Sequence, residues 1–544
     1  MKTKTTVIRK LLALILACIM LAAIVACGKS DGATPDSSPP AGGAPAGNSP
    51  AGGGDAASGK DTISVAMTQD SGTLHPHQNT GTDVFGIYNG MLYEPLWLID
   101  NHGELIYLLA TGYDIVGPDT MHIYLREGVT FSDGSEFDSE DALFSLISWN
   151  NREGQQGIFP QMDMEASKII DKYTIELVLN EFNINLFSQI SWLCMFDKQT
   201  YDINSLSVTP NGTGPYVLED YVVNSHMYVT RRSDYWGTQP KVQNFHFLMF
   251  KEESQIVNAL QTGAVQLARI PFQDVEFVQS LPNINVDLVP CEDQQALMFN
   301  ISSYSIFHEN REARMAVAHA IDRDSIIRAV YYDYAKKSVM PGPATCFDVD
   351  DRFYNLGIYG HDYDPDLAKQ LAASSGLDNM EIRLINNGDS RIVLMCEIIQ
   401  ANLRDIGVTC NVTNLDMGSW VSNLFDETAW DMCIDYSWAQ NLLYSGNLRY
   451  MIRSMSAESW KNYDWVGHDR AMELVVDGPE LLTTIFDVDR RKELNLEITR
   501  LVIDEVLWLG IVDEVYTWAL SAELAGDAKD YAGDMKLFFN LYYA

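Results

Sequence analysis

The chain has 544 residues, 47% of them apolar, and this composition predicts a globular body that is too large for one simple hydrophobic core. Its formal net charge of −37 argues against nucleic acid as a partner, because phosphate binding needs clustered lysine and arginine. The charge permits cationic or zwitterionic ligands but does not require them.

The first 26 residues predict a secretory signal. An uncharged apolar run, residues 11–26, follows four basic side chains: Lys2, Lys4, Arg9 and Lys10. The run is shorter than the about 20 residues that a membrane-spanning helix needs. It ends in Ile-Val-Ala before Cys27, which is similar to the bacterial lipobox, where the cysteine is lipidated and becomes the new N-terminus. Cys18 follows a second, weaker match, and the alternative is an uncleaved anchor in which Cys27 is an ordinary thiol.

Residues 28–60 consist mainly of glycine, alanine, proline, serine and aspartate, without an aromatic residue. Such a segment buries too little apolar surface to offset its ordering entropy, so it is predicted to be disordered. We interpret it as a tether between a lipid on Cys27 and the folded body.

Six cysteines remain beyond Cys18 and Cys27, and none forms a CxxC pair, so zinc and redox motifs are not indicated. An exported protein can form disulfides, but Cys396 and Cys433 lie inside apolar runs, where a buried free thiol is an equal alternative, and the spacing predicts no pairing. The six are Cys194, Cys291, Cys346, Cys396, Cys410 and Cys433.

The folded body opens with a predicted strand at 61–67, where apolar and polar residues alternate, and a similar strand is predicted at 120–125. Residues 139–149 have helical apolar spacing, with Ser139 as the expected N-cap. Shorter helices are predicted at 254–260 and 312–321.

The second half of the body predicts a strand at 380–385, a long amphipathic helix at 391–406 that ends at Gly407, and a strand at 408–412. This spacing of strand, helix and strand predicts a right-handed parallel unit. Mixed α/β domains are therefore expected.

Short motifs follow one another along residues 61 to about 520, and each motif alone is weak. They are residues 93–96 (YEPL), Asp100, Gly103, 125–129 (LREGV), 131–134 (FSDG), Glu140, Asp141, 212–216 (GTGPY), 235–237 (YWG), 299–300 (FN), 311–323 (REARMAVAHAIDR) and 363–376. Together they resemble family 5 extracellular solute-binding proteins, the oligopeptide, dipeptide and nickel binders of ABC importers. Most of these residues are expected to build the fold and not to contact ligand.

The resemblance implies an α/β fold of the two-lobed, type II periplasmic-binding-protein kind, with an extra domain inserted in the first lobe. Ligand would bind between the lobes, which close on it. The implied boundaries are 1–26 for the signal, 27–60 for the lipidated cysteine and linker, 61–95, 210–298 and 505–544 for the first lobe, 96–209 for the inserted domain, and 299–504 for the second lobe.

The resemblance places the ligand contacts mainly in residues 415–443. Trp420 and Trp438 correspond to cleft tryptophans of oligopeptide binders, and the alternative is that both are core residues. Asn441 stands where the peptide binders use an aspartate to neutralise the ligand ammonium. An asparagine supplies no charge, which favours a blocked peptide, a sugar or another neutral solute. Asp435, followed by Tyr436, could substitute if the alignment shifts.

Arg391 begins the helix predicted at 391–406 and could face a ligand carboxylate. The alternative is a solvated residue at a helix start.

The sequence thus predicts a binding protein and not an enzyme, without a cofactor or a metal site. It would be lipid-anchored on the extracytoplasmic face of the cell membrane, as a monomer, and would pass a small solute, most simply a peptide, to an ABC permease and its ATPase. A nickel carrier is an alternative, because His75 and His77 form a close histidine pair. A sugar binder, an exported hydrolase and a peptide-signal sensor are the others, although no GxSxG, HExxH or Walker pattern occurs.

Overall fold

The computed structural model describes residues 61–70, 72–74, 77, 88–99, 103–150, 162–180, 182–202, 209–343, 345–354, 361–424, 426–438, 443–445, 448, 465–478, 481–526 and 541–544. Cys18, Cys27, the predicted tether and Asn441 lie outside these residues. Among the described residues, none of the helices combines the length and the apolar character needed to cross a membrane.

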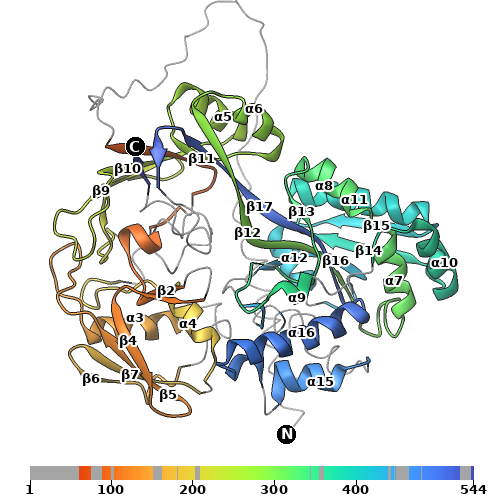
Figure 1. The fold of residues 1–544 in the computed structure, drawn as a ribbon, viewed down its shortest axis with the longest axis horizontal. Coiled ribbons are helices and arrows are strands. Elements are labelled where there is room, and N and C mark those ends of the chain that lie inside the picture. Colours follow the sequence, from red (N-terminus) through yellow and green to blue (C-terminus); the bar gives the residue numbers. More distant parts are fainter. Residues whose placement is uncertain are drawn as a thin grey trace, which may run out of the picture. The chain divides into compact units, whose positions relative to one another are not determined.

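The largest sheet has eleven strands, and two long antiparallel strands, β12 (Ile284–Phe299) and β17 (Trp508–Ser521), run side by side through its middle (Figure 1). The strand order is β15-β14-β16-β12-β17-β11-β1-β10-β9-β8, and β13 pairs with β17. The other strands of this sheet are β1 (Thr62–Met67), β8 (Tyr216–Val222), β9 (His226–Arg231), β10 (Asn244–Met249), β11 (Leu267–Arg269), β13 (Lys336–Lys337), β14 (Glu381–Asn386), β15 (Thr409–Asn414) and β16 (Met432–Trp438).

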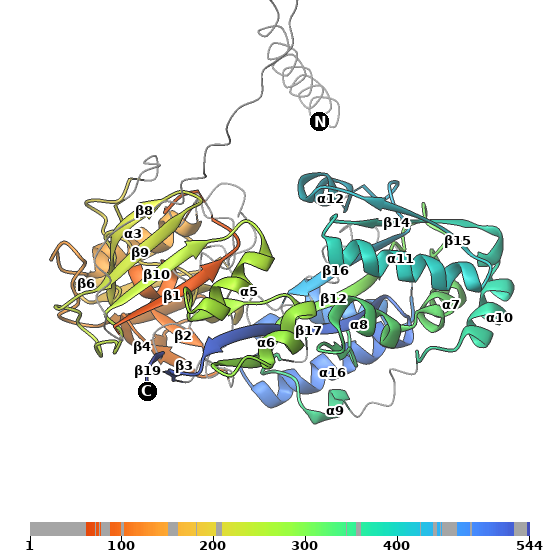
Figure 2. The same ribbon diagram turned by 90° about the horizontal axis from the view of Figure 1, so that it is seen from above.

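One hydrophobic core, here called the second core, lies around β14, β15, β16 and the adjoining half of β12. Strands β14 and β15 are parallel and are joined by α11 (Ser390–Asp405), which confirms the predicted strand–helix–strand unit (Figure 2). The other helices of this part are α7 (Arg311–Ala320), α8 (Arg323–Tyr331), α9 (Asp351–Tyr354), α10 (Pro365–Ser375), η4 (Leu377–Asn379), α12 (Met417–Leu424), α15 (His468–Met472), η5 (Glu473–Asp477), η6 (Leu482–Thr484) and α16 (Val488–Asp504).

A first core joins β1, β9 and β10 to a separate four-stranded sheet of order β4-β5-β7-β6. Its elements are η2 (Tyr88–Leu92), β2 (Trp97–Ile99), β3 (Leu105–Tyr107), β4 (Ala110–Ile115), β5 (Thr120–Leu125), α3 (Ser139–Asn150), β6 (Lys168–Asp171), β7 (Thr174–Val178), α4 (Asn185–Ile190), β18 (Leu524–Ala525) and β19 (Tyr542–Tyr543). A smaller cluster packs α5 (Glu253–Thr262), η3 (Phe272–Asp274) and α6 (Val275–Gln279) against the large sheet.

The predicted elements are confirmed within one or two residues at their ends, and the mixed α/β fold is confirmed with them. The expected N-cap of α3 was wrong. Asp138, not Ser139, stands before the helix, and its carboxylate accepts from the Glu140 N–H at 2.8 Å. The Ser139 N–H instead donates to the carbonyl of Lys172 at 2.9 Å, because β6 and β7 pack beside this end of the helix. The predicted domain boundaries stay predictions.

The six cysteines beyond Cys27 are all buried and free in the structure, so the disulfide alternative does not apply to them. Burial raises the pKa of the Cys396 thiol and of the Cys410 thiol to about 12. These thiols are therefore unreactive core side chains at neutral pH.

Candidate functional site

The two long strands β12 and β17 pass from the first core to the second, and their pairing is interrupted between the two cores. Residues 291–293 of β12 face only Glu514 of β17, and a second register shift follows between Gln295 and Ala296. Bulges of this kind bend a strand and re-aim its side chains, and they are enriched next to functional sites. We call this region the crossover.

Glu514 lies opposite the main bulge and is 8% exposed. Its carboxylate accepts hydrogen bonds from three elements: the Gln295 amide at 3.1 Å, the Tyr331 hydroxyl at 2.7 Å and the Arg391 guanidinium at 3.4 Å. A buried carboxylate is costly unless donors satisfy it, so this network fixes β12, α8 and α11 against β17.

Arg391 stands in the first turn of α11, where Asp389 caps the helix by accepting from the Arg391 N–H at 2.9 Å. The guanidinium also lies 3.6 Å from the Asp389 carboxylate, and 43% of the side chain is exposed. Arg391 is therefore held from both sides, by Asp389 and by Glu514, and as a partly exposed residue of the first turn it also remains compatible with the alternative of a solvated helix start. Its role toward a ligand carboxylate stays a prediction.

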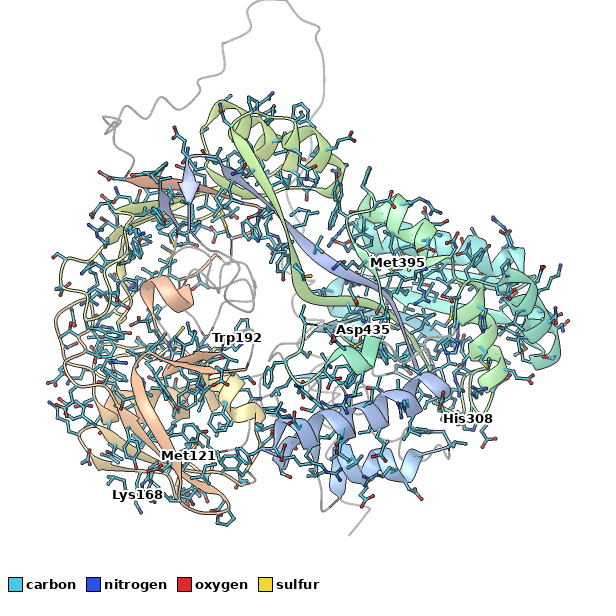
Figure 3. All side chains as sticks on the ribbon, viewed as in Figure 1. Met121, Lys168, Trp192, His308, Met395 and Asp435 are labelled. Atoms are coloured by element: carbon cyan, nitrogen blue, oxygen red, sulfur yellow. The ribbon has the colours of Figure 1, made fainter. Side chains whose placement is uncertain are left out.

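Asp435 lies on β16 with 1% of its surface exposed, directly opposite Ala296 of β12 (Figure 3). Strand β16 is parallel to β14 with Ile385 opposite Cys433, so residues 435–438 extend beyond the carboxyl end of β14, where α11 begins. In α/β sheets, ligands bind outside the carboxyl ends of parallel strands. Asp435 thus lies just beyond the carboxyl end of the neighbouring parallel strand, where a ligand is expected.

Two further predicted residues, Tyr436 and Trp438, follow Asp435 on the same strand. Their backbones pair with Gln295 and Asp293, which places them at the crossover, while their side chains lie outside the described structure. The structure therefore brings the end of β16 and Arg391 to the same crossover, because Gln295 pairs with one and shares Glu514 with the other.

Trp420 is 3% exposed and lies inside the second core, on α12. Its indole N–H points to the Cys433 sulfur at 3.2 Å. These surroundings are those expected if Trp420 is a core residue, which is the alternative interpretation. Its role as a ligand wall stays a prediction.

The histidine pair of the nickel alternative is described only at His77, which is 6% exposed. The ring packs edge-on against Trp149, with centroids 4.2 Å apart, and its Nδ1 lies 2.5 Å from the Tyr201 hydroxyl. His77 is thus a residue of the first core. Within the described parts of the chain, no group of three potential ligand side chains is placed to hold a metal ion.

A cavity of about 490 Å³ lies away from the crossover, near the start of β12 and the end of β17. Polar residues such as Gln279 and Asn285 line it together with Leu524. It contains none of the predicted site residues.

Three of the sequence motifs meet in the first core around Glu94, which is 2% exposed. Its carboxylate accepts from the Tyr235 hydroxyl at 2.6 Å and from the Trp236 indole at 3.0 Å. Burial raises the pKa of Glu94 to about 7, although both hydrogen bonds oppose this shift. Residues 93–96, which are buried, and residues 235–237, which are half-buried, are therefore parts of one hydrogen-bonded cluster, which supports their role in building the fold.

The third motif, 212–216, contributes glycines that leave room for this cluster. A Cβ at Gly212 would lie 2.0 Å from the Leu92 carbonyl oxygen, and one at Gly214 would lie 2.4 Å from that of Met91. The backbone of the motif passes too close to η2 for any larger residue.

Replacement of Gly212 by alanine is therefore expected to lower the free energy of unfolding by about 3 kcal/mol, the upper end for an overpacked site, because backbone atoms have to move. Urea unfolding followed by circular dichroism measures this loss. Gly112→Ala is the matched control, since the nearest atom to its added Cβ is on Tyr124 at 4.0 Å. Equal stability of both variants would contradict the close approach.

The crossover residues that the sequence analysis missed are Glu514, Gln295 and Asp513. Gln294, next to Gln295, donates its amide to the Asp513 carboxylate at 2.8 Å, and burial raises the pKa of Asp513 to about 6. The available signal was two adjacent acidic residues in the otherwise apolar run 508–521. A charged pair inside a buried strand needs partners, and this points to a polar site.

Comparison with known proteins decides the family. The family described as "Bacterial extracellular solute-binding proteins, family 5 Middle" matches residues 104–459, which is more than half of the chain. The chain belongs to this family. Its fold class is the two-lobed periplasmic-binding-protein class, as predicted.

An ABC transporter peptide-binding protein of Brucella ovis is 24% identical over 356 residues, which cover 62% of this chain and 65% of the relative. The match thus spans less than two thirds of that relative. The nickel-binding periplasmic protein of Escherichia coli is 24% identical over 378 residues, or 64% of this chain and 70% of the relative. The solved structure of DppA from Helicobacter pylori in complex with the peptide STSA has a TM-score of 0.71 and 21% identity, covering 89% of this chain and 98% of that one.

Proposed function

We propose that this family 5 protein captures a peptide or a similar small solute at the crossover of its two lobes and delivers it to an ABC permease and its ATPase. The observation that carries the proposal is the crossover itself. Two bulged strands join the lobes there, beside a buried network of charged residues at the carboxyl edge of the parallel strands. Hinging about two strands closes the lobes when the closed state binds solute better than the open state.

A peptide is the solute that the comparisons favour, because the Brucella relative is named for peptide binding and the Helicobacter structure holds one. The Escherichia coli relative is named for nickel, but the aromatic surroundings of His77 give the metal alternative no support. In the proposed site, Arg391 and the end of β16 offer a cation and the carboxylate of Asp435, which suit the two ends or polar groups of an extended peptide.

The peptide terminus distinguishes the candidate partners. If Asn441 takes the position of the family's aspartate, tetraalanine and N-acetyl-tetraalanine bind within about threefold of each other, since no buried charge depends on the ammonium. A preference of about tenfold or more for the free amine would assign the counter-charge to a carboxylate, and Asp435 is the first to test.

Isothermal titration calorimetry on protein freed of co-purified solute measures both affinities. Asp435→Asn removes a preference for the free amine if Asp435 is the partner, whereas Asp324→Asn, at a site 55% exposed on α8, leaves it unchanged. Failure of a broad set of peptides to bind would contradict a peptide carrier.

The same proposal places the protein on the extracytoplasmic face of the membrane through a lipid on Cys27. Cys27→Ala is expected to move the protein from the membrane fraction to the medium or soluble extracytoplasmic fraction, because each buried CH₂ of an acyl chain contributes about 0.8 kcal/mol to anchoring. Fractionation and immunoblotting measure the distribution, with Cys18→Ala as the control that stays bound. Persistent membrane association of Cys27→Ala would contradict lipidation.

A further inference from the structure

The two cores touch at a second place besides strands β12 and β17. Phe486, which precedes α16, packs on Phe182 with ring centroids 5.1 Å apart and reaches Phe187 at 6.4 Å. Beside these rings, the Ile184 N–H donates to the Thr483 carbonyl at 2.6 Å. Phe182 and Phe187 belong to the first core, whereas the segment around Thr483 is packed on the second, so this contact joins the lobes.

A separate contact is made by Phe347, whose chain neighbours Cys346 and Val349 belong to the second core but whose own ring packs against the first core. Its ring rests on Gly103, in the turn between β2 and β3, where an added Cβ would lie 2.6 Å from the ring. Gly103 also has φ of +82°, a conformation that glycine adopts at little cost. The turn is therefore shaped to receive this ring.

One buried cation connects both contacts. Arg491 on α16 is 1% exposed; its Nε lies 3.4 Å from the Asp348 carboxylate, and its Nη1 donates to the Ile485 carbonyl at 2.6 Å. Asp348 directly follows Phe347, and Ile485 directly precedes Phe486. The planar guanidinium thus fixes the backbone next to both aromatic rings, a task that its fork of donors suits.

We propose that Phe347 and Phe486, held on one frame by Arg491, form a clasp that fastens the second lobe to the first when the protein closes, and that this clasp slows the release of captured solute. The inference rests on the proposed function. Phe486 is still 43% exposed in the contact, so its packing is only partial. Partial packing makes the contact reversible, which distinguishes a clasp from a permanent core. The clasp acts beside the two connecting strands, which by themselves leave the lobes free to hinge.

Hydrogen–deuterium exchange of the full-length protein tests the clasp through the Ile184 amide, which is protected by its bond across the lobes. Phe486→Ala is expected to raise exchange in the segment 182–190 about tenfold, because local opening becomes more populated. Phe277→Ala is the matched control: this phenylalanine is 47% exposed, lies on α6 and takes no part in the clasp. Unchanged exchange in α11 shows that the second lobe of each variant remains folded.

Arg491→Lys tests the common frame. Lysine keeps a charge for Asp348 but cannot also reach the Ile485 carbonyl with a planar fork. It is expected to raise exchange in both 182–190 and 105–107, whereas Phe486→Ala raises it only in 182–190 and Phe347→Ala only in 105–107. A change confined to one segment in Arg491→Lys would overturn the coupling of the two contacts.

Stopped-flow release of tetraalanine tests the consequence for solute. Phe486→Ala is expected to raise the dissociation rate about fivefold or more, since interface changes act mainly on dissociation. The control Phe277→Ala is expected to release tetraalanine at the same rate as the unaltered protein. Unchanged exchange at Ile184, or raised exchange with an unchanged release rate, overturns the proposal. If the unaltered protein binds no peptide, the proposed function fails, and the exchange experiment still decides whether the lobes are clasped.

Discussion

Replacement of Asp348 by alanine is expected to lower the free energy of unfolding by about 3–5 kcal/mol, because it leaves a buried guanidinium without its counter-charge. Asp348 is fully buried and accepts from the Tyr444 N–H at 2.5 Å and the Asn495 amide at 2.9 Å, besides its ion pair with Arg491. The carboxylate thus satisfies one charge and several donors at once. Removing it costs the full desolvation penalty of these groups.

Urea unfolding of Asp348→Ala measures this loss, and Asp350→Ala is a matched control in the same loop. Asp350 pairs with Arg352, but the two side chains are 30% and 49% exposed, so the loss there is expected to stay below about 1 kcal/mol. Equal losses in the two variants would show that burial does not decide the strength of the Asp348 pair. Crystal or solution structures of Asp348→Ala that retain the fold would also show whether Phe347 still rests on Gly103.

The second large effect is a pH dependence of stability that comes from Glu94. Its pKa is raised to about 7 in the folded protein, above its ordinary value, so the folded state holds a proton that the unfolded state releases. The stability that this proton supplies is fully present below about pH 4.5 and is lost as the pH rises through about 7. The two values imply a loss of about 3 kcal/mol from this group over that window.

Glu94→Gln is expected to remove this part of the pH dependence. The Gln amide resembles the protonated acid: its oxygen accepts from the Trp236 indole, and its NH₂ faces the Tyr235 hydroxyl, which can also accept. Urea unfolding at pH 4.5 to 8 should therefore show the two proteins diverging by about 3 kcal/mol, with Glu94→Gln the more stable at high pH. Glu127→Gln, at an exposed position, is the control, and a parallel pH profile for Glu94→Gln would refute the raised pKa.

Much of the site was predictable in position but not in role. The resemblance placed Asp435, Tyr436 and Trp438 near a ligand, and the start of the predicted helix suggested Arg391. The structure places the backbone of these β16 residues and the side chain of Arg391 at the crossover. Glu514, the carboxylate that connects Arg391 to β12, was missed, since it is 123 residues away from Arg391 in the chain. Local patterns carry no information about such pairs, which exist only after β17 passes between the lobes.

Trp420 also shows that local sequence patterns do not reveal tertiary contacts. A tryptophan on a short amphipathic helix suits either a ligand wall or a core, and the helical spacing of α12 is the same in both cases. Its placement against Cys433 follows from how α12 packs on β16, which the local sequence does not state.

The sequence by itself determined the elements and the family, because periodicity, helix caps and ordered motifs are local properties that do not depend on distant parts of the chain. The helix at 391–406 between two parallel strands and the glycine motif at 212–216 are examples. The tertiary structure alone decided which charges are buried, which tryptophan lies in the core and which aromatic residues join the lobes. The physical reason is that burial and pairing depend on chain segments hundreds of residues apart, such as Gln295 and Glu514, whose approach is fixed by packing and not by spacing.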